Sequence, residues 1–173
     1  MKNIVLTGFM ASGKTTVGME VAKKLNLMFY DTDKIIEEQE HKTITQIFED
    51  DGEKYFRELE NKLAISLKNI ENAVIATGGG FVINSQNIDL MRQNGVIINL
   101  KTSPEIIEER MKFAKNNRPL LQESLEEILE RFNKRKIYYN NNDICIKLTN
   151  EMTVDECSDL VIEAYKDFVG EDI

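Results

Sequence analysis

The chain has 173 residues, about the length of one domain, and 42% of them are apolar, which is enough for a sizeable core. Its net charge of −8 argues against a general nucleic-acid-binding protein but is compatible with a local basic pocket for a small anion. No apolar run reaches the roughly 18 residues of a membrane-spanning helix, and the first residues lack a signal-peptide pattern, so we expect a cytoplasmic protein.

Short apolar runs alternate along the chain with longer segments of helical periodicity. We expect strands over 4–7, 27–30, 73–77, 96–100 and 144–148, and helices over 15–25, 34–40, 44–50, 55–69, 85–94, 104–114, 125–139 and 154–169. This alternation predicts a parallel sheet that is covered on both faces. Cys145 and Cys157 are isolated in the sequence, so we expect them to be packing residues in a reducing compartment rather than a metal or redox pair.

Residues 8–15, GFMASGKT, match the phosphate-loop pattern G-x-x-x-x-G-K-[ST] between a predicted strand and a predicted helix. The glycines permit a tight curl whose backbone N–H groups surround an anion, and the following helix N-terminus adds partial positive charge. In such a loop Lys14 reaches the β- and γ-phosphates of a nucleotide, and the Thr15 hydroxyl binds Mg²⁺. The predicted nucleotide-binding residues of this segment are Gly8, Ala11, Ser12, Gly13, Lys14, Thr15 and Thr16.

Two aspartates, Asp31 and Asp33, follow the second predicted strand directly. Ligands of open parallel sheets bind at the carboxyl ends of the strands, so we expect both carboxylates in the crevice that the phosphate loop borders. One carboxylate could hold Mg²⁺ through water, and the other could accept a hydrogen bond from a substrate hydroxyl. The alternative is that Asp33 caps the following helix, and the two roles are compatible.

Three further stretches carry weaker signals. Arg57 and Glu60 are spaced i and i+3 on a predicted helix, where a surface salt bridge is the simpler interpretation. The three glycines at 78–80 end the third predicted strand and would let a ligand touch the backbone. Arg118 lies in a polar segment between two predicted helices, which suits a mobile lid over the phosphates and equally suits a solvated loop.

Together these motifs resemble those of the shikimate kinase family over nearly the whole chain. Many nucleotide-binding proteins share the phosphate loop alone, whereas the full combination is far more specific. The matching parts are residues 8–15, Asp31-Thr32-Asp33, Phe56-Arg57 with Glu60, Gly78-Gly79-Gly80, Arg118-Pro119-Leu120, and Arg135 with a tyrosine after it. The resemblance implies a three-layer α/β/α phosphate-loop kinase fold with a five-stranded parallel sheet in the order 2-3-1-4-5. It also implies a single kinase domain over 1–173, with an acceptor-binding helical segment at about 33–61 and a lid at about 112–123.

The resemblance further implies that the chain transfers a phosphoryl group from ATP to the 3-hydroxyl of shikimate with the help of Mg²⁺. Catalytic roles would fall to Lys14, Asp33 and Arg118, and Mg²⁺ would be held by Thr15 and Asp31. Shikimate would be bound by Asp33, Arg57, Gly79, Gly80 and Arg135, with Glu60 holding Arg57 in place. Arg110 and Arg118 would add contacts to the nucleotide. The family is generally monomeric, and we expect no nucleic-acid or membrane partner.

Some alternatives stay open at this point. In the family an arginine precedes a tyrosine by four residues, as Arg135 precedes Tyr139, whereas alignment on the acidic Asp143 pairs Lys134 with Tyr138. We prefer Arg135 because a guanidinium binds a carboxylate through two parallel hydrogen bonds. Two other functions are possible: another small-molecule kinase with a phosphate loop, such as a gluconate kinase, or a nucleotide-binding module without turnover.

Overall fold

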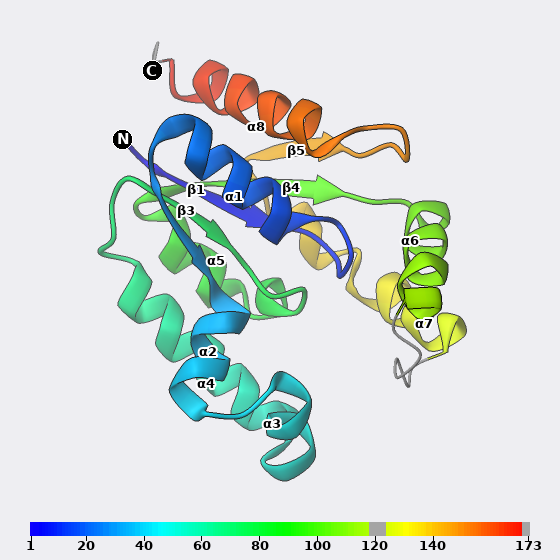
Figure 1. Ribbon diagram of the computed structural model, residues 1–173. Coiled ribbons are helices and arrows are strands. Elements are labelled where there is room, and N and C mark those ends of the chain that lie inside the picture. Colours follow the sequence, from blue (N-terminus) through cyan, green and yellow to red (C-terminus); the bar gives the residue numbers. More distant parts are fainter. Residues whose placement is uncertain (118–123, 171–173) are drawn as a thin grey trace.

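The computed structural model describes residues 1–117 and 124–170. Its strands form one sheet in the order β2-β3-β1-β4-β5, and every neighbouring pair is parallel (Figure 1). The strands are β1 (Asn3–Thr7), β2 (Met28–Asp31), β3 (Ala73–Ala76), β4 (Gly95–Lys101) and β5 (Ile144–Lys147). The predicted fold class and strand order are therefore confirmed.

Helices cover both faces of this sheet. The helices of the described chain are α1 (Lys14–Leu25), α2 (Thr32–Glu40), α3 (Ile44–Asp50), α4 (Gly52–Leu67), α5 (Ser85–Arg92), α6 (Pro104–Asn117), α7 (Leu125–Arg135) and α8 (Val154–Val169), with the 3₁₀ turns η1 (Phe81–Ile83) and η2 (Tyr138–Asn140). Helices α1 and α8 lie on one face, and α4 and α5 lie on the other (Figure 1).

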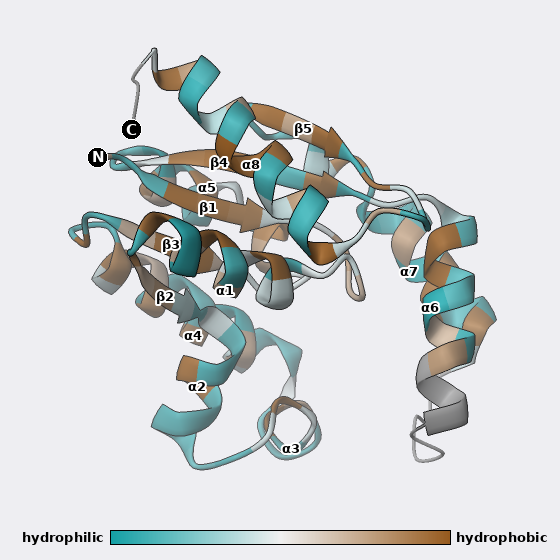
Figure 2. Cartoon of the chain, turned by 45° about the horizontal axis from the view of Figure 1, so that its top comes forward, coloured by the Kyte–Doolittle hydropathy of each residue, from teal (hydrophilic) through white to brown (hydrophobic). Residues whose placement is uncertain are grey.

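Successive residues of the central strands enter opposite cores. In β1, Ile4 and Leu6 pack with α1 and α8, whereas Val5 packs with α4 and α5. A strand that is buried on both faces reads as a continuous apolar run, which is why these strands could be located from the sequence. Figure 2 shows the strands as mainly hydrophobic and the outer sides of the helices as hydrophilic.

The carboxyl ends of β1, β2 and β3 lie side by side and position the site. Leu6 of β1 pairs with Ala76 of β3, and Ala76 pairs with Asp31 of β2. Just past the ladder, the Thr77 backbone N–H and hydroxyl both donate to the Leu6 carbonyl at 3.0 Å. The phosphate loop, the aspartates after β2 and the glycines after β3 therefore start from one edge of the sheet.

Three expectations from the sequence need correction. The helix predicted over 125–139 ends at Arg135, because the chain turns there so that the Tyr139 hydroxyl donates to the Gly79 carbonyl. Helix α4 begins three residues earlier than predicted, since Asp51 is both the C-cap of α3 and the N-cap of α4. Cys145 is exposed on the edge strand β5, whereas Cys157 is buried in α8 as expected.

Helices α2 and α3, with the first turns of α4, project from the sheet as a small lobe that corresponds to the predicted acceptor-binding segment (Figure 1). Of the predicted lid at 112–123, residues 118–123 lie outside the described residues. Within the described part of the chain, no helix has both the length and the apolar character needed to cross a bilayer.

Candidate active site

The phosphate loop connects β1 to α1 as a compact anion cradle. Gly8 and Gly13 adopt positive φ angles of 146° and 88°, which side chains rarely tolerate. A Cβ atom on Gly8 would also lie 2.7 Å from the Leu100 carbonyl oxygen. Ala11 also has a positive φ, of 60°, so residues with left-handed and right-handed backbone conformations alternate along the loop. Such a curl aims backbone N–H groups at one point, and α1 directs its partial positive charge at the same point.

Lys14, the first residue of α1, folds back across this cradle. Its ammonium donates to the carbonyl oxygens of Gly8 and Phe9 at 2.8 Å each and to Ser12 Oγ at 3.3 Å. Burial lowers the pKa of Lys14 to about 8, although the neighbouring carboxylate of Asp33 favours the charged form. The Lys14 ammonium is therefore fixed in place beside the cradle and loses its proton more readily than an ordinary lysine.

Thr15 and Asp31 form a pair of oxygen ligands beside the cradle. The Thr15 hydroxyl donates to Asp31 Oδ2 at 2.6 Å, while Asp31 Oδ1 accepts the backbone N–H groups of Asp33 and Lys34. Asp31, not Asp33, is thus the N-cap of α2, which leaves the Asp33 side chain free of that role. One hydroxyl and one carboxylate fit Mg²⁺ that is otherwise held by phosphates and water. No cluster of three or more His, Cys, Asp or Glu side chains that could hold a metal ion occurs among the described residues.

The Asp33 carboxylate lies against the first glycine after β3. A Cβ atom on Gly78 would be only 2.3 Å from Asp33 Oδ1, so this approach requires glycine. The pKa of Asp33 is raised to about 6, because burial and, to a smaller extent, the Asp31 carboxylate raise it more than the Lys14 ammonium lowers it. A carboxyl group with this pKa exchanges protons close to neutral pH, which is useful in acid–base chemistry.

Arg57 is fixed between two glutamates and the glycine segment. Its guanidinium contacts Glu60 Oε2 at 2.6 Å and Glu53 Oε1 at 2.9 Å. A Cβ atom on Gly80 would lie 2.4 Å from both terminal nitrogens of Arg57, so the guanidinium rests directly on the backbone there. The simple surface salt bridge considered for the sequence is therefore wrong: the Glu60 side chain is 1% exposed.

Glu60 itself is held in an unusual state. Burial raises its pKa to about 7, and the Arg57 cation opposes that rise. Its second oxygen, Oε1, is buried and accepts no hydrogen bond from the described residues. A buried acceptor of this kind has spare capacity for a donor from a ligand.

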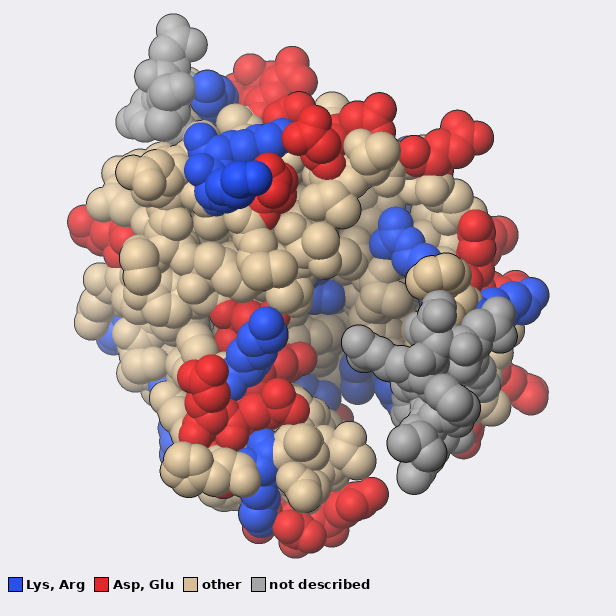
Figure 3. Space-filling model, viewed as in Figure 1, with Lys and Arg blue, Asp and Glu red and all other residues tan. Residues whose placement is uncertain are grey.

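Arg135 and Tyr139 close the same region from the other side. The Tyr139 hydroxyl donates to the Gly79 carbonyl. Burial lowers the pKa of Arg135, and the nearby Arg57 cation lowers it further, so two guanidinium groups influence each other here. Lys134, the alternative considered above, instead points to solvent, where it pairs with Glu130 at 2.6 Å. Figure 3 shows the molecule hollowed between the α2–α3 lobe and the α6–α7 side, with Lys and Arg atoms within the hollow.

The comparisons with known proteins agree with this geometry. The model of the family described as Shikimate kinase matches residues 10–166. A shikimate kinase of Caldanaerobacter subterraneus subsp. tengcongensis is 46% identical over 167 residues, which cover 95% of this chain and 96% of that protein. A shikimate kinase of Caldicellulosiruptor saccharolyticus is 50% identical over 145 residues, covering 83% and 84%.

The chain belongs to the shikimate kinase family. Solved structures of the family have the same fold. The structure of shikimate kinase from Acinetobacter baumannii in complex with shikimate matches with a TM-score of 0.83 at 32% identity, over 98% of this chain and 94% of that one. Shikimate kinase from Bacteroides thetaiotaomicron also matches with a TM-score of 0.83 at 32% identity, over 98% and 99% of the two chains.

Apart from the hollow described above, a small cavity adjoins the outer side of the phosphate loop. The Arg110 guanidinium donates to the Ala11 carbonyl at 2.7 Å and lines, with Thr16, a cavity of about 140 Å³. The segment after β5 and the start of α8 complete the lining through residues that the sequence did not suggest: Leu148, Met152, Thr153, Val154 and Cys157. Their only signal in the sequence was their place after the carboxyl end of a strand. Arg118 lies outside the described residues.

The raised pKa of Glu60 predicts a specific pH dependence of stability. Because the folded state binds this proton more tightly than the unfolded chain, the contribution of Glu60 to the free energy of unfolding is greatest below its ordinary pKa of 4.5 and declines as the pH rises to about 7. Glu60→Gln removes the titration. Between pH 5 and 7.5, wild type should therefore lose on the order of 2 kcal/mol relative to this variant in urea unfolding.

The control for this experiment is Glu58→Gln, which alters an exposed glutamate two residues away on α4. Its pH dependence should match that of wild type. Parallel pH profiles for wild type and Glu60→Gln would show that burial does not perturb Glu60 as described.

Proposed function

We propose that the chain transfers the γ-phosphoryl group of ATP to the 3-hydroxyl of shikimate, which gives shikimate 3-phosphate and ADP. Membership of the shikimate kinase family supports this proposal. The observation that carries it is the fixed guanidinium of Arg57 on the Gly80 backbone, in the crevice that also holds Asp33 and Lys14. A carboxylated polyol needs both an arginine clamp and a hydroxyl-binding carboxylate next to a phosphate site.

On the donor side, the backbone N–H groups of the phosphate loop and the N-terminus of α1 bind the phosphates of ATP. Lys14 exchanges its loop carbonyl partners for β- and γ-phosphate oxygens, a stronger charge-assisted contact. The adenine ring of ATP occupies the cavity beside Arg110. Thr15 and Asp31 hold Mg²⁺, which neutralises negative charge on the phosphates when it is bound.

On the acceptor side, Arg57 and Arg135 bind the carboxylate of shikimate, and Glu60 keeps Arg57 in place. The hydroxyl groups contact Asp33 and the backbone of Gly79 and Gly80, which Tyr139 supports through its hydrogen bond to Gly79. Asp33 accepts a hydrogen bond from the attacking hydroxyl and takes its proton as the phosphoryl group arrives. Arg118, outside the described residues, remains a predicted lid residue that adds positive charge and helps to exclude water.

The chemical alternative is a gluconate kinase, because gluconate also carries a carboxylate and hydroxyl groups. A nucleotide-binding module without turnover would not need the perturbed pair of Asp33 and Lys14. ADP formation with shikimate, with gluconate and without an acceptor distinguishes these cases. Stimulation by shikimate supports the proposal, stimulation by gluconate alone refutes it, and ATP binding without stimulation indicates the module. We further propose that the protein acts in the cytoplasm as a monomer and binds neither nucleic acid nor membranes.

Neighbouring cations on α7 allow a matched test of the carboxylate clamp. Arg135→Gln should raise the KM for shikimate by about one to two powers of ten, since a charge-assisted, two-point contact is lost, and should leave the KM for ATP within about twofold. Lys134→Gln, one residue away and exposed, should leave both KM values near those of wild type. The reverse result would mean that Lys134 holds the carboxylate.

The pKa values of the free enzyme predict a bell-shaped profile for kcat/KM. Asp33 must be ionised to accept a proton, so activity should fall as the pH drops through about 6. Lys14 must be charged, so activity should fall as the pH rises past about 8. Asp33→Asn should lower kcat by about two to four powers of ten and remove the acidic limb. Persistence of that limb in Asp33→Asn would assign it to another group.

A further inference from the structure

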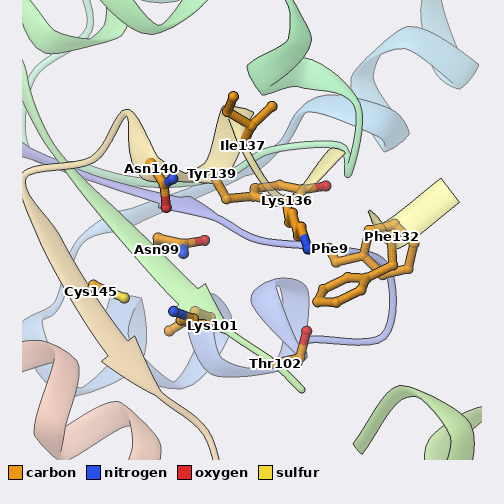
Figure 4. A pocket seen from close by; sticks show the side chains of 11 residues that line it. Phe9, Asn99, Lys101, Thr102, Phe132, Lys136, Ile137, Tyr139, Asn140 and Cys145 are labelled. Atoms are coloured by element: carbon orange, nitrogen blue, oxygen red, sulfur yellow. The ribbon is translucent and has the colours of Figure 1, made fainter. Parts of the chain in front are cut away.

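A separate cavity of about 440 Å³ lies next to Phe9 of the phosphate loop and to the carboxyl-terminal part of β4, with Cys145 of β5 also in its lining (Figure 4). We call it the β4–β5 cavity. Its lining comes from the loop, from β4 and β5, and from the end of α7 with η2: Phe9, Asn99, Leu100, Lys101, Thr102, Phe132, Lys136, Ile137, Tyr139, Asn140 and Cys145. Its volume is within the usual range of small-molecule sites.

This cavity is distinct from the catalytic crevice. Among the described residues, none of the side chains assigned above to ATP, Mg²⁺ or shikimate lines it, and Phe9 is the only lining residue that also belongs to the phosphate loop. The two regions share only a wall: the Phe9 ring packs edge-to-face against Phe132 at 5.3 Å and near Tyr139 at 6.4 Å. On the other side of that wall, the Phe9 carbonyl accepts a hydrogen bond from Lys14, and Tyr139 binds Gly79.

Two buried polar atoms of the lining lack partners. Asn99 Oδ1 and Thr102 Oγ1 make no hydrogen bond to any described residue, although the two residues are only 4% and 5% exposed. Asn99 interrupts the apolar run of β4, where an aliphatic residue would be the stable choice. A buried polar group without a partner costs free energy, so its presence in a cavity points to an occupant that satisfies it. In Figure 4 the Asn99 oxygen and the Thr102 hydroxyl face the cavity.

The charge and shape of the lining narrow the class of occupant. Lys101 and Lys136 line the cavity, and no carboxylate of the described residues does, although the whole chain carries a net charge of −8. Figure 4 shows the Lys136 ammonium directed into the space between Asn99 and Phe9. The rings of Phe9, Phe132 and Tyr139 meet edge-to-face and form an apolar wall against which an aromatic ring can pack.

We propose that the β4–β5 cavity binds a small planar organic anion that carries a hydrogen-bond donor, of the class of the aromatic hydroxycarboxylates. The lysines bind its carboxylate, the aromatic wall holds its ring, and its hydroxyl donates to Asn99 Oδ1. The Thr102 hydroxyl donates to the carboxylate or accepts from the hydroxyl. Because Phe9 and Tyr139 form the shared wall, such an occupant would contact the back of the catalytic crevice.

Cys145 provides a direct readout, since it is exposed and lines the cavity, while the buried Cys157 serves as an internal reference. The probe is 4-hydroxybenzoate, and the measurement is the rate of alkylation of each cysteine by iodoacetamide, followed by mass spectrometry of the full chain. At ten times its dissociation constant, the probe should slow alkylation of Cys145 about tenfold by mass action. Cys157 should be unaffected.

Chemical analogues and variants define what must be recognised. Benzoate, which lacks the donor, and 4-hydroxybenzamide, which lacks the charge, should each protect Cys145 about tenfold more weakly. Lys136→Gln and Thr102→Val should weaken the effect of 4-hydroxybenzoate similarly. Lys147 is an exposed lysine on β5, the strand that carries Cys145, but it lies outside the cavity. Lys147→Gln should therefore leave the protection by 4-hydroxybenzoate unchanged. Shikimate-dependent turnover of each variant reports whether it is folded.

The outcomes separate this proposal from the assigned function. Saturating shikimate should leave the protection of Cys145 intact, because its proposed site is in the other crevice. Competition by shikimate would show that the probe acts from the catalytic site and would overturn the proposal. Absence of protection at millimolar 4-hydroxybenzoate, or equal protection by all three compounds, would also overturn it. If Thr102→Val fails to fold, the comparison of Lys136→Gln with its control Lys147→Gln still tests the proposal, because both substitutions alter exposed lysines.

Discussion

The buried ion pair between Arg57 and Glu60 is the contact on which the acceptor side depends. Glu60 is almost fully buried, so its carboxylate fixes the direction of the guanidinium, and the absence of a side chain at Gly80 lets that guanidinium lie on the backbone. The glycine backbone in turn adjoins the phosphate loop, since a Cβ atom on Gly79 would be 3.3 Å from the Met10 nitrogen. The ion pair thereby holds the guanidinium, the proposed carboxylate ligand, against a backbone segment that adjoins the phosphate loop.

The same crevice keeps three ionisable groups away from their ordinary pKa values. Burial is the main cause for Lys14, Asp33 and Glu60, whose pKa values move to about 8, 6 and 7. Each shift means that the free enzyme holds a charge in a less favourable environment than water. Bound phosphates near Lys14 and hydroxyl groups near the carboxylates would improve that environment. The site therefore favours ligands that place these groups there. Perturbed groups that cluster at a site are a common sign of function.

Much of the fold followed from the sequence because strands buried on both faces, such as β1, are visible as continuous apolar runs. The phosphate loop was equally visible, since its glycines and lysine have fixed spacing. Other features depend on contacts between distant segments, which periodicity does not encode. The cap of α2 proved to be Asp31 instead of Asp33, and α7 ended early because Tyr139 bonds to the segment after β3. The preference for Arg135 over Lys134 came from guanidinium chemistry, whereas the exposed ion pair of Lys134 with Glu130 depends on the orientation of α7. The β4–β5 cavity likewise depends on how η2 packs beside β4, which the sequence does not encode.

The most direct test of the central claim is to measure the equilibrium dissociation constants of shikimate and of ATP for Arg57→Lys. Lysine keeps the positive charge but loses the planar two-point contact with a carboxylate. The account predicts that shikimate binds at least about tenfold more weakly while ATP binds as in wild type, since the proposed role of Arg57 lies in the acceptor site and not in the nucleotide site. Equal weakening of both ligands, or unchanged affinity for shikimate, would contradict it.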